Sequence, residues 1–100
     1  MTRPLTLFQV ASAVSDEESF LGFIEALRDD RSEEAAIEAT HPSNPYGPGA
    51  LGWENGSIEA FLDAASAWGR ATAHATDTYA VPENPWRRAA QIICAGKFYE

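Results

Sequence analysis

The middle of the chain is an 18-residue stretch, residues 40–57 (THPSNPYGPGALGWENGS), that contains three prolines and four glycines. Proline has no backbone N–H and glycine loses the most conformational entropy when ordered, so neither a helix nor a strand is expected here. A loop of this length in a small domain is typically packed, functional or disordered. Because Tyr46, Leu51 and Trp53 are large side chains that disordered segments rarely contain, we expect an ordered loop.

Trp53 has two interpretations, and Tyr46 shares the second. A tryptophan at the junction of a loop and a helix most often packs beneath the loop, against the core. Where partly exposed, Tyr46 and Trp53 would instead be anchors for a protein partner, because large aromatic groups dominate binding energies. Both are therefore candidate protein-binding residues.

Apolar residues recur at helical spacing in the rest of the chain. The spacing predicts a helix from Ser15 to about residue 31, another from residue 58 to residues 69–72, and a third from Pro85 to about residue 95. Residues 32–39 contain good helix formers but few apolar groups, so they either extend the first of these helices or form a separate turn. Residues 1–14 fit either a short helix, which we favour, or a short strand that starts at Leu5, Leu7 and Phe8.

Local signals mark the ends of these helices. Ser15 and Glu18 are spaced as a capping box at the start of the first long helix. Inside that helix, Gly22 costs up to about 1 kcal/mol of helix propensity relative to alanine, so we expect it to mark a close approach of two helices.

The last helix has its own start and stop signals. Asn84 is a capping residue, Pro85 suits the first helical position, and Gly96 suits a left-handed C-terminal position. Arg87 and Arg88 oppose the helix dipole at this end, so at least one of them should pair with a carboxylate. The candidate carboxylates are Glu54, Glu83 and Glu100.

These elements predict a mainly α fold, a compact bundle of three to four helices with a long Pro/Gly-rich loop across one end. A chain of 100 residues has a common single-domain size, so residues 1–100 are expected to form one helical domain. The expected core consists of ten large side chains: Phe20, Phe23, Ile24, Leu27, Ile58, Phe61, Leu62, Trp68, Trp86 and Ile93.

Acidic residues are concentrated in the first two thirds of the chain. The chain has 15 acidic and 7 basic residues, a formal net charge of −8, and residues 16–63 contain twelve acids against only Arg28 and Arg31. Such a field repels phosphate backbones, so nucleic-acid binding is not expected, and it speeds encounter with a basic protein. Solubility alone is the other explanation. The candidate docking residues on the first long helix are Asp16, Glu17, Glu25, Asp29, Asp30, Glu33 and Glu34.

Several other sites and locations are not expected. The single cysteine, Cys94, allows neither an internal disulfide nor a cysteine-based zinc site, and its apolar neighbours predict a buried position. No apolar run reaches the roughly 18 residues of a membrane-spanning helix, and the N-terminus is a poor match to a signal peptide, so we expect no membrane partner and a cytoplasmic location. Catalytic, cofactor and metal motifs are missing, and His41 and His74 fall in predicted loops; we expect no catalytic residue, cofactor or metal.

The leading functional prediction is a non-enzymatic protein-binding module with an acidic face for a basic partner. One alternative is a small hydrolase or transferase that uses loop residues such as His41 and Glu54. Another is a homo-oligomeric structural protein whose exposed aromatic residues form the interface.

Four stretches of the sequence resemble one family. Residues 52–68 (GWENGSIEAFLDAASAW), 81–87 (VPENPWR) and 98–100 (FYE) resemble a family of small acidic bacterial proteins of unknown function, and residues 15–27 (SDEESFLGFIEAL) look like its first helix. The resemblance implies one compact domain and brings no established activity. In size and charge the chain is also similar to bacterial immunity proteins that neutralise toxins, which makes the expected role immunity- or inhibitor-like.

Overall fold

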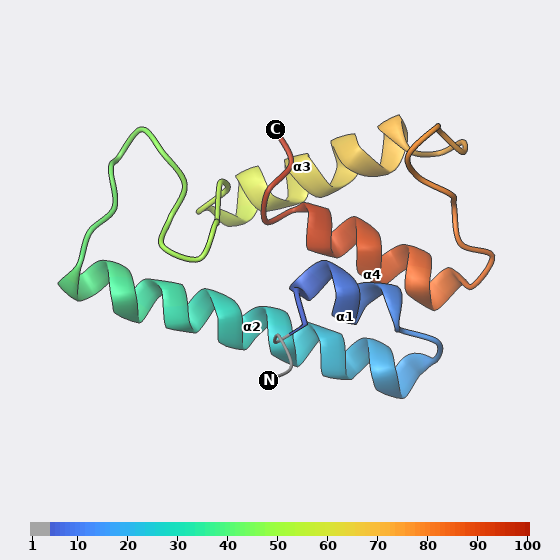
Figure 1. Cartoon of the computed structure of the whole chain (residues 1–100), viewed down its shortest axis with the longest axis horizontal. Coiled ribbons are helices and arrows are strands. Elements are labelled where there is room, and N and C mark those ends of the chain that lie inside the picture. The colour runs from blue at the N-terminus through green and yellow to red at the C-terminus, as the bar shows by residue number, and fades with distance from the viewer. Residues whose placement is uncertain (1–4) are drawn as a thin grey trace.

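The computed structural model describes residues 5–100, which form four helices (Figure 1). They are α1 (Leu7–Ser12), α2 (Glu17–Thr40), α3 (Ile58–Ala71) and α4 (Pro85–Ala95). The described residues include no strand, which confirms the predicted mainly α fold, and the alternative of a strand starting at Leu5, Leu7 and Phe8 is wrong. The predictions that concern residues 1–4 lie outside the described residues.

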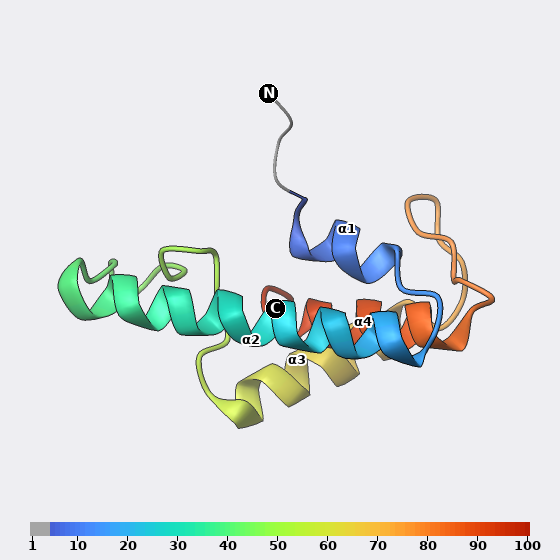
Figure 2. The same cartoon turned by 90° about the horizontal axis from the view of Figure 1, so that it is seen from below.

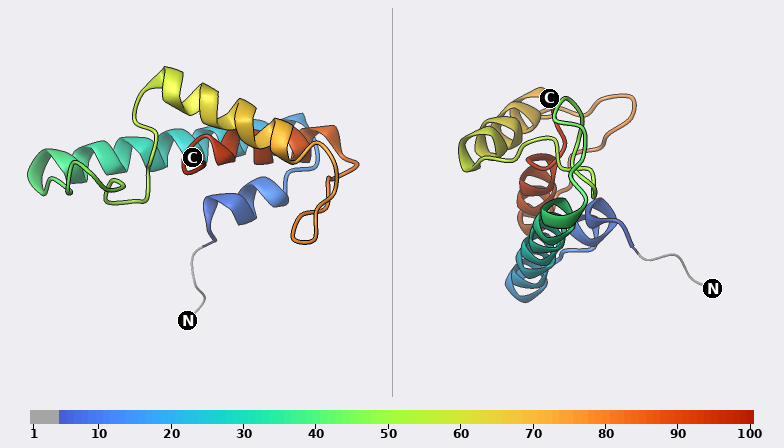
Figure 3. Two further views of the ribbon diagram at one scale, coloured as in Figure 1. Left: turned by 90° about the horizontal axis from the view of Figure 1, so that it is seen from above. Right: turned by 90° about the vertical axis from the view of Figure 1, so that its left-hand side faces the viewer.

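The central element of the fold is α4. It packs against each of the other three helices, and α1 also packs against α2. Figure 2 shows α1 and α3 on opposite sides of the layer formed by α2 and α4, and the end-on view in Figure 3 shows the same arrangement. Among the helices of the described residues, the backbone of α3 lies close to that of α4 alone, and α1 reaches α3 only through the edge-to-face contact of Phe8 with Trp68, so much of the surface of α3 is uncovered.

The start of α2 differs from the prediction by one residue. Its N-cap is Asp16, whose Oδ1 accepts a hydrogen bond from the backbone N–H of Ser19 at 2.8 Å, while the Ser19 hydroxyl accepts from the backbone N–H of Asp16 at 3.1 Å. The predicted capping box of Ser15 and Glu18 is therefore wrong. Aspartate and serine are equally good N-caps, so propensity alone did not separate the two positions.

The end of α2 settles the alternatives for residues 32–39. The helix continues to Thr40, so this stretch extends α2 and forms no separate turn. Because the stretch has few apolar side chains, its packing depends on polar contacts with the loop of residues 41–57, which crosses back toward α3 (Figure 1).

The predicted start of α4 is confirmed, and the predicted conformation at its end is wrong. The side chain of Asn84 accepts a hydrogen bond from the backbone N–H of Trp86 at 2.9 Å, and Pro85 is the first helical residue. Gly96 has a φ of −56°, which is right-handed. Glycine is required there for space, because a Cβ at position 96 would lie 2.8 Å from both the ring and the backbone oxygen of Phe61.

We predict that Gly96→Ala lowers the free energy of unfolding by about 1–3 kcal/mol, because the added methyl group forces α3 away from α4. Gly22→Ala is the control. A Cβ at Gly22 would meet nothing within 4 Å, so the predicted close helix approach there is wrong. This change should raise stability by about 0.5–1 kcal/mol through helix propensity. Urea unfolding followed by circular dichroism measures both effects, and an unchanged midpoint for Gly96→Ala would contradict the packing argument.

The core lies where α1, α2 and α4 meet and is closed by Trp53 of the loop. Cys94 is buried there as predicted, and burial raises the pKa of its thiol to about 11. The buried residues of the core are Ala11, Val14, Phe23, Leu27, Trp53, Ala90 and Cys94.

The predicted core is correct for most of its ten residues and wrong for three. Phe20, Ile24, Phe61 and Ile93 are half-buried against the buried residues. Ile58, Leu62 and Trp86 are exposed. For the two α3 residues the reason is that α4 is the only helix whose backbone lies close to α3 in the described structure. The apolar stripe of α3 is wider than the surface that α4 covers, so Ile58 and Leu62 are left exposed.

Candidate functional site

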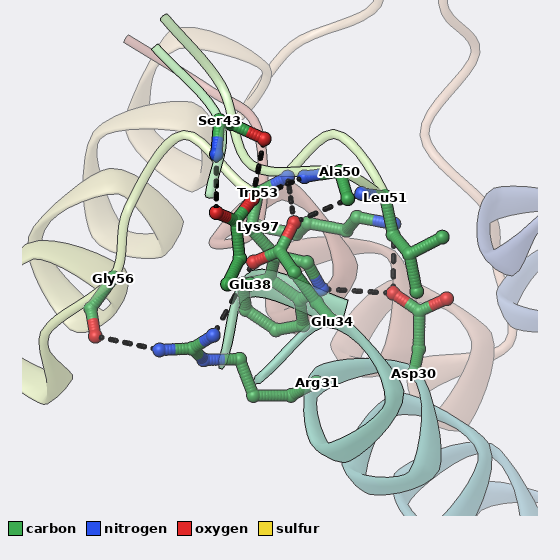
Figure 4. A network of polar contacts seen from close by, with 10 residues as sticks. All are labelled: Asp30, Arg31, Glu34, Glu38, Ser43, Ala50, Leu51, Trp53, Gly56 and Lys97. Carbon is green, nitrogen blue, oxygen red and sulfur yellow. Dashed lines mark hydrogen bonds and ion pairs between the residues drawn. The ribbon is translucent and has the colours of Figure 1, made fainter. Parts of the chain in front are cut away.

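Three acids of α2 lie on one side of the helix and bind the loop of residues 41–57. Asp30, Glu34 and Glu38 are spaced four residues apart, so their side chains share one helical face. Figure 4 shows the three carboxylates among the backbone and side-chain groups of the loop. We call these residues the loop-binding acids.

Glu34 is the most buried of the loop-binding acids, with 3% of its surface exposed. Its Oε1 accepts hydrogen bonds from the backbone N–H groups of Leu51 and Trp53 at 3.0 and 3.2 Å. Its Oε2 pairs with the guanidinium of Arg31 at 3.2 Å. A buried carboxylate is tolerated only when it is paired and hydrogen-bonded, and this one has both kinds of partner.

Asp30 and Glu38 fix the two ends of the loop. Asp30 Oδ2 accepts from the indole N–H of Trp53 and from the ammonium of Lys97, both at 2.8 Å, and so links the loop to the segment after α4. Glu38 accepts from the backbone N–H and the hydroxyl of Ser43 and from the backbone N–H of Ala50. The bonds from Ser43, the hydroxyl first, hold the pKa of Glu38 below its usual value.

Trp53 fills the space between the loop and the core. It is 7% exposed and its ring stacks on Phe61 with centroids 6.0 Å apart. The cationic groups of Arg31 and Lys97 lie 5.6 and 5.7 Å from the centre of the indole. Such cation–π contacts add to the packing, so Trp53 is held by apolar, polar and charged partners together.

The predicted docking residues therefore separate into two groups. Asp30 and Glu34, which the sequence placed on a docking surface, instead hold the loop, and their placement as surface residues is corrected. Of the two interpretations of Trp53, the first is confirmed, because this residue packs beneath the loop, and its place among the docking residues is corrected. Tyr46, at the tip of the same loop, is 98% exposed. Asp16 is exposed, but its carboxylate is the N-cap of α2.

The remaining predicted docking residues are exposed along α2, and we call Glu17, Glu25, Asp29 and Glu33 the outer acids. Asp29 has an ion pair with Arg28 at 2.9 Å, in which both side chains are about two-thirds exposed. A pair that exposed contributes little to stability. Within residues 5–100, Glu17, Glu25 and Glu33 have no hydrogen bond or ion pair with another side chain.

The arginines that open α4 bind carbonyl groups and aromatic rings rather than the predicted carboxylates. Arg88 donates to the backbone oxygen of Gly69 at 2.8 Å, and its guanidinium lies 5.4 Å from the ring centre of Trp68. Arg87 donates to the backbone oxygen of Val14 at 3.0 Å. The predicted pairing with Glu54, Glu83 or Glu100 is wrong among the described residues. The guanidinium groups donate instead to the backbone oxygens of Val14 and Gly69.

The residues of the hydrolase alternative have partners of their own. The His41 ring hydrogen-bonds the hydroxyl of its neighbour Thr40 at 3.0 Å. A hydrogen bond with Glu100 raises the pKa of Glu54 above its usual value. No hydrogen bond joins His41 to Glu54 in the described part of the chain, and no group of three His, Cys, Asp or Glu residues within it is arranged to hold a metal ion.

Sequence reasoning missed a small hollow at the start of α3. Its volume is about 200 Å³, and one side is formed by the Trp53 and Phe61 rings. Ile58 borders it and is 75% exposed. Periodicity pointed to Ile58 but assigned it to the core, because spacing alone does not show which part of an apolar stripe has a neighbour. The lining residues are Arg31, Trp53, Asn55, Gly56, Ser57, Ile58 and Phe61.

Comparisons with known proteins give one match. Residues 16–100 match the family of unknown function DUF7660. The matched residues make up well over half of the chain. No curated protein and no solved structure matches the chain. In residues 5–100, no helix combines the length and apolar character needed to cross a membrane. From the family match, the chain belongs to DUF7660, a family of unknown function.

Proposed function

We propose that the chain is a non-enzymatic protein-binding module whose outer acids dock a basic protein. One observation carries the proposal: the acids of α2 on the loop side are used by the fold, whereas Glu17, Glu25 and Glu33 contact no oppositely charged group among the described residues. Charges that have no ion pair within the described part of the chain are available to a complementary surface.

The net charge supports the same proposal. A formal charge of −8 on a chain of 100 residues attracts cationic partners over roughly a Debye length, about 8–10 Å at physiological ionic strength, and raises association rates. An immunity- or inhibitor-like protein that neutralises a basic toxin is one form of such a module. The buried, unpaired thiol of Cys94 fits a reducing compartment such as the cytoplasm.

We prefer this proposal to the hydrolase or transferase alternative for a specific reason. Of the polar groups that such chemistry would use, His41 is hydrogen-bonded to Thr40, and no hydrogen bond joins it to Glu54 among the described residues. A general base and its substrate must come within about 3 Å of each other, and neither side chain faces the hollow at the start of α3.

The test is charge reversal at two outer acids. We predict that Glu25→Lys/Glu33→Lys abolishes capture of a basic protein from the native lysate at low salt, because it removes attraction and adds repulsion. The control, Asp77→Lys/Glu83→Lys, changes the net charge equally at exposed acids outside α2 and should keep most of the capture. Quantitative pull-down at two salt concentrations measures both variants.

Two results would contradict the proposal. One is equal loss of capture in both double variants, which would assign the effect to net charge alone. The other is the recovery of no basic protein by the unmodified chain at either salt concentration.

A further inference from the structure

Two large apolar side chains of α3 are exposed on the same side of the helix. Ile58 is 75% and Leu62 is 59% exposed, and they are four residues apart, so they lie next to each other on one face. Among the described residues the backbone of α3 lies close to α4 alone, and the contacts of Phe61 with Trp53 and of Trp68 with Phe8 leave Ile58 and Leu62 exposed. Adjacent exposed apolar groups on a small protein mark an interaction surface more often than isolated ones do.

The hollow at the start of α3 continues this face. Ile58 and Phe61 line it together with Trp53. Its volume of about 200 Å³ is below the roughly 300–1,000 Å³ of sites for drug-sized ligands. The hollow is therefore of a size for a single apolar side chain inserted by a partner.

Acidic residues flank the apolar pair. Glu59 and Asp63 each follow one of the two apolar residues, so they form a second row along α3, and both are exposed. With Leu62 and Ser57 they border a shallow hollow next to the first one. In residues 5–100 neither carboxylate has an ion pair. We call Ile58, Glu59, Leu62 and Asp63 the α3 patch.

We infer that the α3 patch docks an amphipathic helix of a basic partner protein, with an apolar side chain in the hollow and lysine or arginine side chains against Glu59 and Asp63. A helix fits because the i, i+4 ridge of the patch matches the ridges and grooves of a second helix. A second copy of this chain fits worse, because it would bring the same acids and a net charge of −8 against each other. The inference rests on the proposed function and adds to the contact at the outer acids of α2 a second contact, on α3, with a stated shape.

The probe is a synthetic peptide of about 18 leucine and lysine residues with the leucines at helical spacing. Its control has the same composition in an order that spreads the leucines around the helix. Binding is measured by fluorescence anisotropy at low and physiological salt. The test variant is Ile58→Ala/Leu62→Ala, which keeps good helix formers at exposed positions, and the matched control is Leu21→Ala, which removes an exposed leucine from α2.

We expect the amphipathic peptide to bind at least about tenfold more tightly than the reordered peptide. The double variant Ile58→Ala/Leu62→Ala should weaken binding of the amphipathic peptide by about tenfold. Leu21→Ala should change binding by less than about twofold. Glu59→Gln/Asp63→Asn should weaken binding mainly at low salt.

The experiment distinguishes failure of the α3 patch from failure of the proposed function. If both peptides bind equally and Ile58→Ala/Leu62→Ala has no effect, the α3 patch is overturned while the proposed function stands. If neither peptide binds at low salt, the α3 patch and the proposed attraction for basic partners are both overturned. A dimer in sedimentation velocity that Ile58→Ala/Leu62→Ala converts to monomer would overturn the inference in favour of a second copy as the occupant.

Discussion

Replacing Glu34 with alanine is expected to lower the free energy of unfolding by about 2–4 kcal/mol. The change leaves the backbone N–H groups of Leu51 and Trp53 without their acceptor and leaves Arg31 without its ionic partner. Each buried donor that loses its partner costs about 1–3 kcal/mol, which is why the expected loss exceeds that of an ordinary hydrogen bond. Urea unfolding followed by circular dichroism measures the change.

Two variants separate this mechanism from loss of charge. Glu33→Ala removes an exposed carboxylate from the adjacent position and should change stability by no more than about 0.5 kcal/mol. Glu34→Gln keeps an acceptor for both loop N–H groups and loses the ion pair, so its stability should lie between those of Glu34→Ala and the unmodified chain. If Glu34→Ala and Glu33→Ala have the same midpoint, the loop is not held by Glu34.

Replacing Trp53 with alanine is expected to cost about 3–5 kcal/mol, the largest effect of any single substitution considered. The change removes a buried aromatic group that stacks on Phe61, and it takes away the N–H that Asp30 accepts and the ring that Lys97 contacts. Trp53→Phe keeps an apolar ring and loses the bond to Asp30, so a smaller loss of about 1–2 kcal/mol is expected. Thermal unfolding by calorimetry or circular dichroism measures both.

Tyr46→Ala is the matched control, because it truncates an aromatic residue of the same loop that is 98% exposed. Its stability should stay within about 0.5 kcal/mol of that of the unmodified chain. Equal losses for Trp53→Ala and Tyr46→Ala would contradict the view that the packing of Trp53 joins the loop to the core.

The helices were predictable because their signals are local. Apolar spacing located α2, α3 and α4, and the Asn84-Pro85 pair located the start of α4, since a cap and a fixed proline φ act within a few residues. The length of α2 was left open because residues 32–39 lack apolar groups. Their packing comes from Glu34 and Glu38, whose loop partners lie up to 19 residues away in the sequence.

The candidate site was predictable only in its charge. Counting residues identified an acidic surface on the first long helix. The count did not show that Glu34 is buried, with 3% of its surface exposed, while its neighbour Glu33 is exposed. In the sequence both are simply acids on a helix. The exposed pair on α3 was also missed. Ile58 and Leu62 have the spacing of core residues, and only the position of α4 shows that they are left uncovered.

Sequence alone determined that this chain is helical, interrupted by a loop at residues 40–57 and strongly acidic, because propensity, periodicity and net charge are properties of the residues themselves. The tertiary structure alone decided which acids serve the fold and which face outward. That difference depends on which N–H groups and cations come within hydrogen-bond distance of each carboxylate, and those groups are contributed by distant segments, residues 43–56 and Lys97.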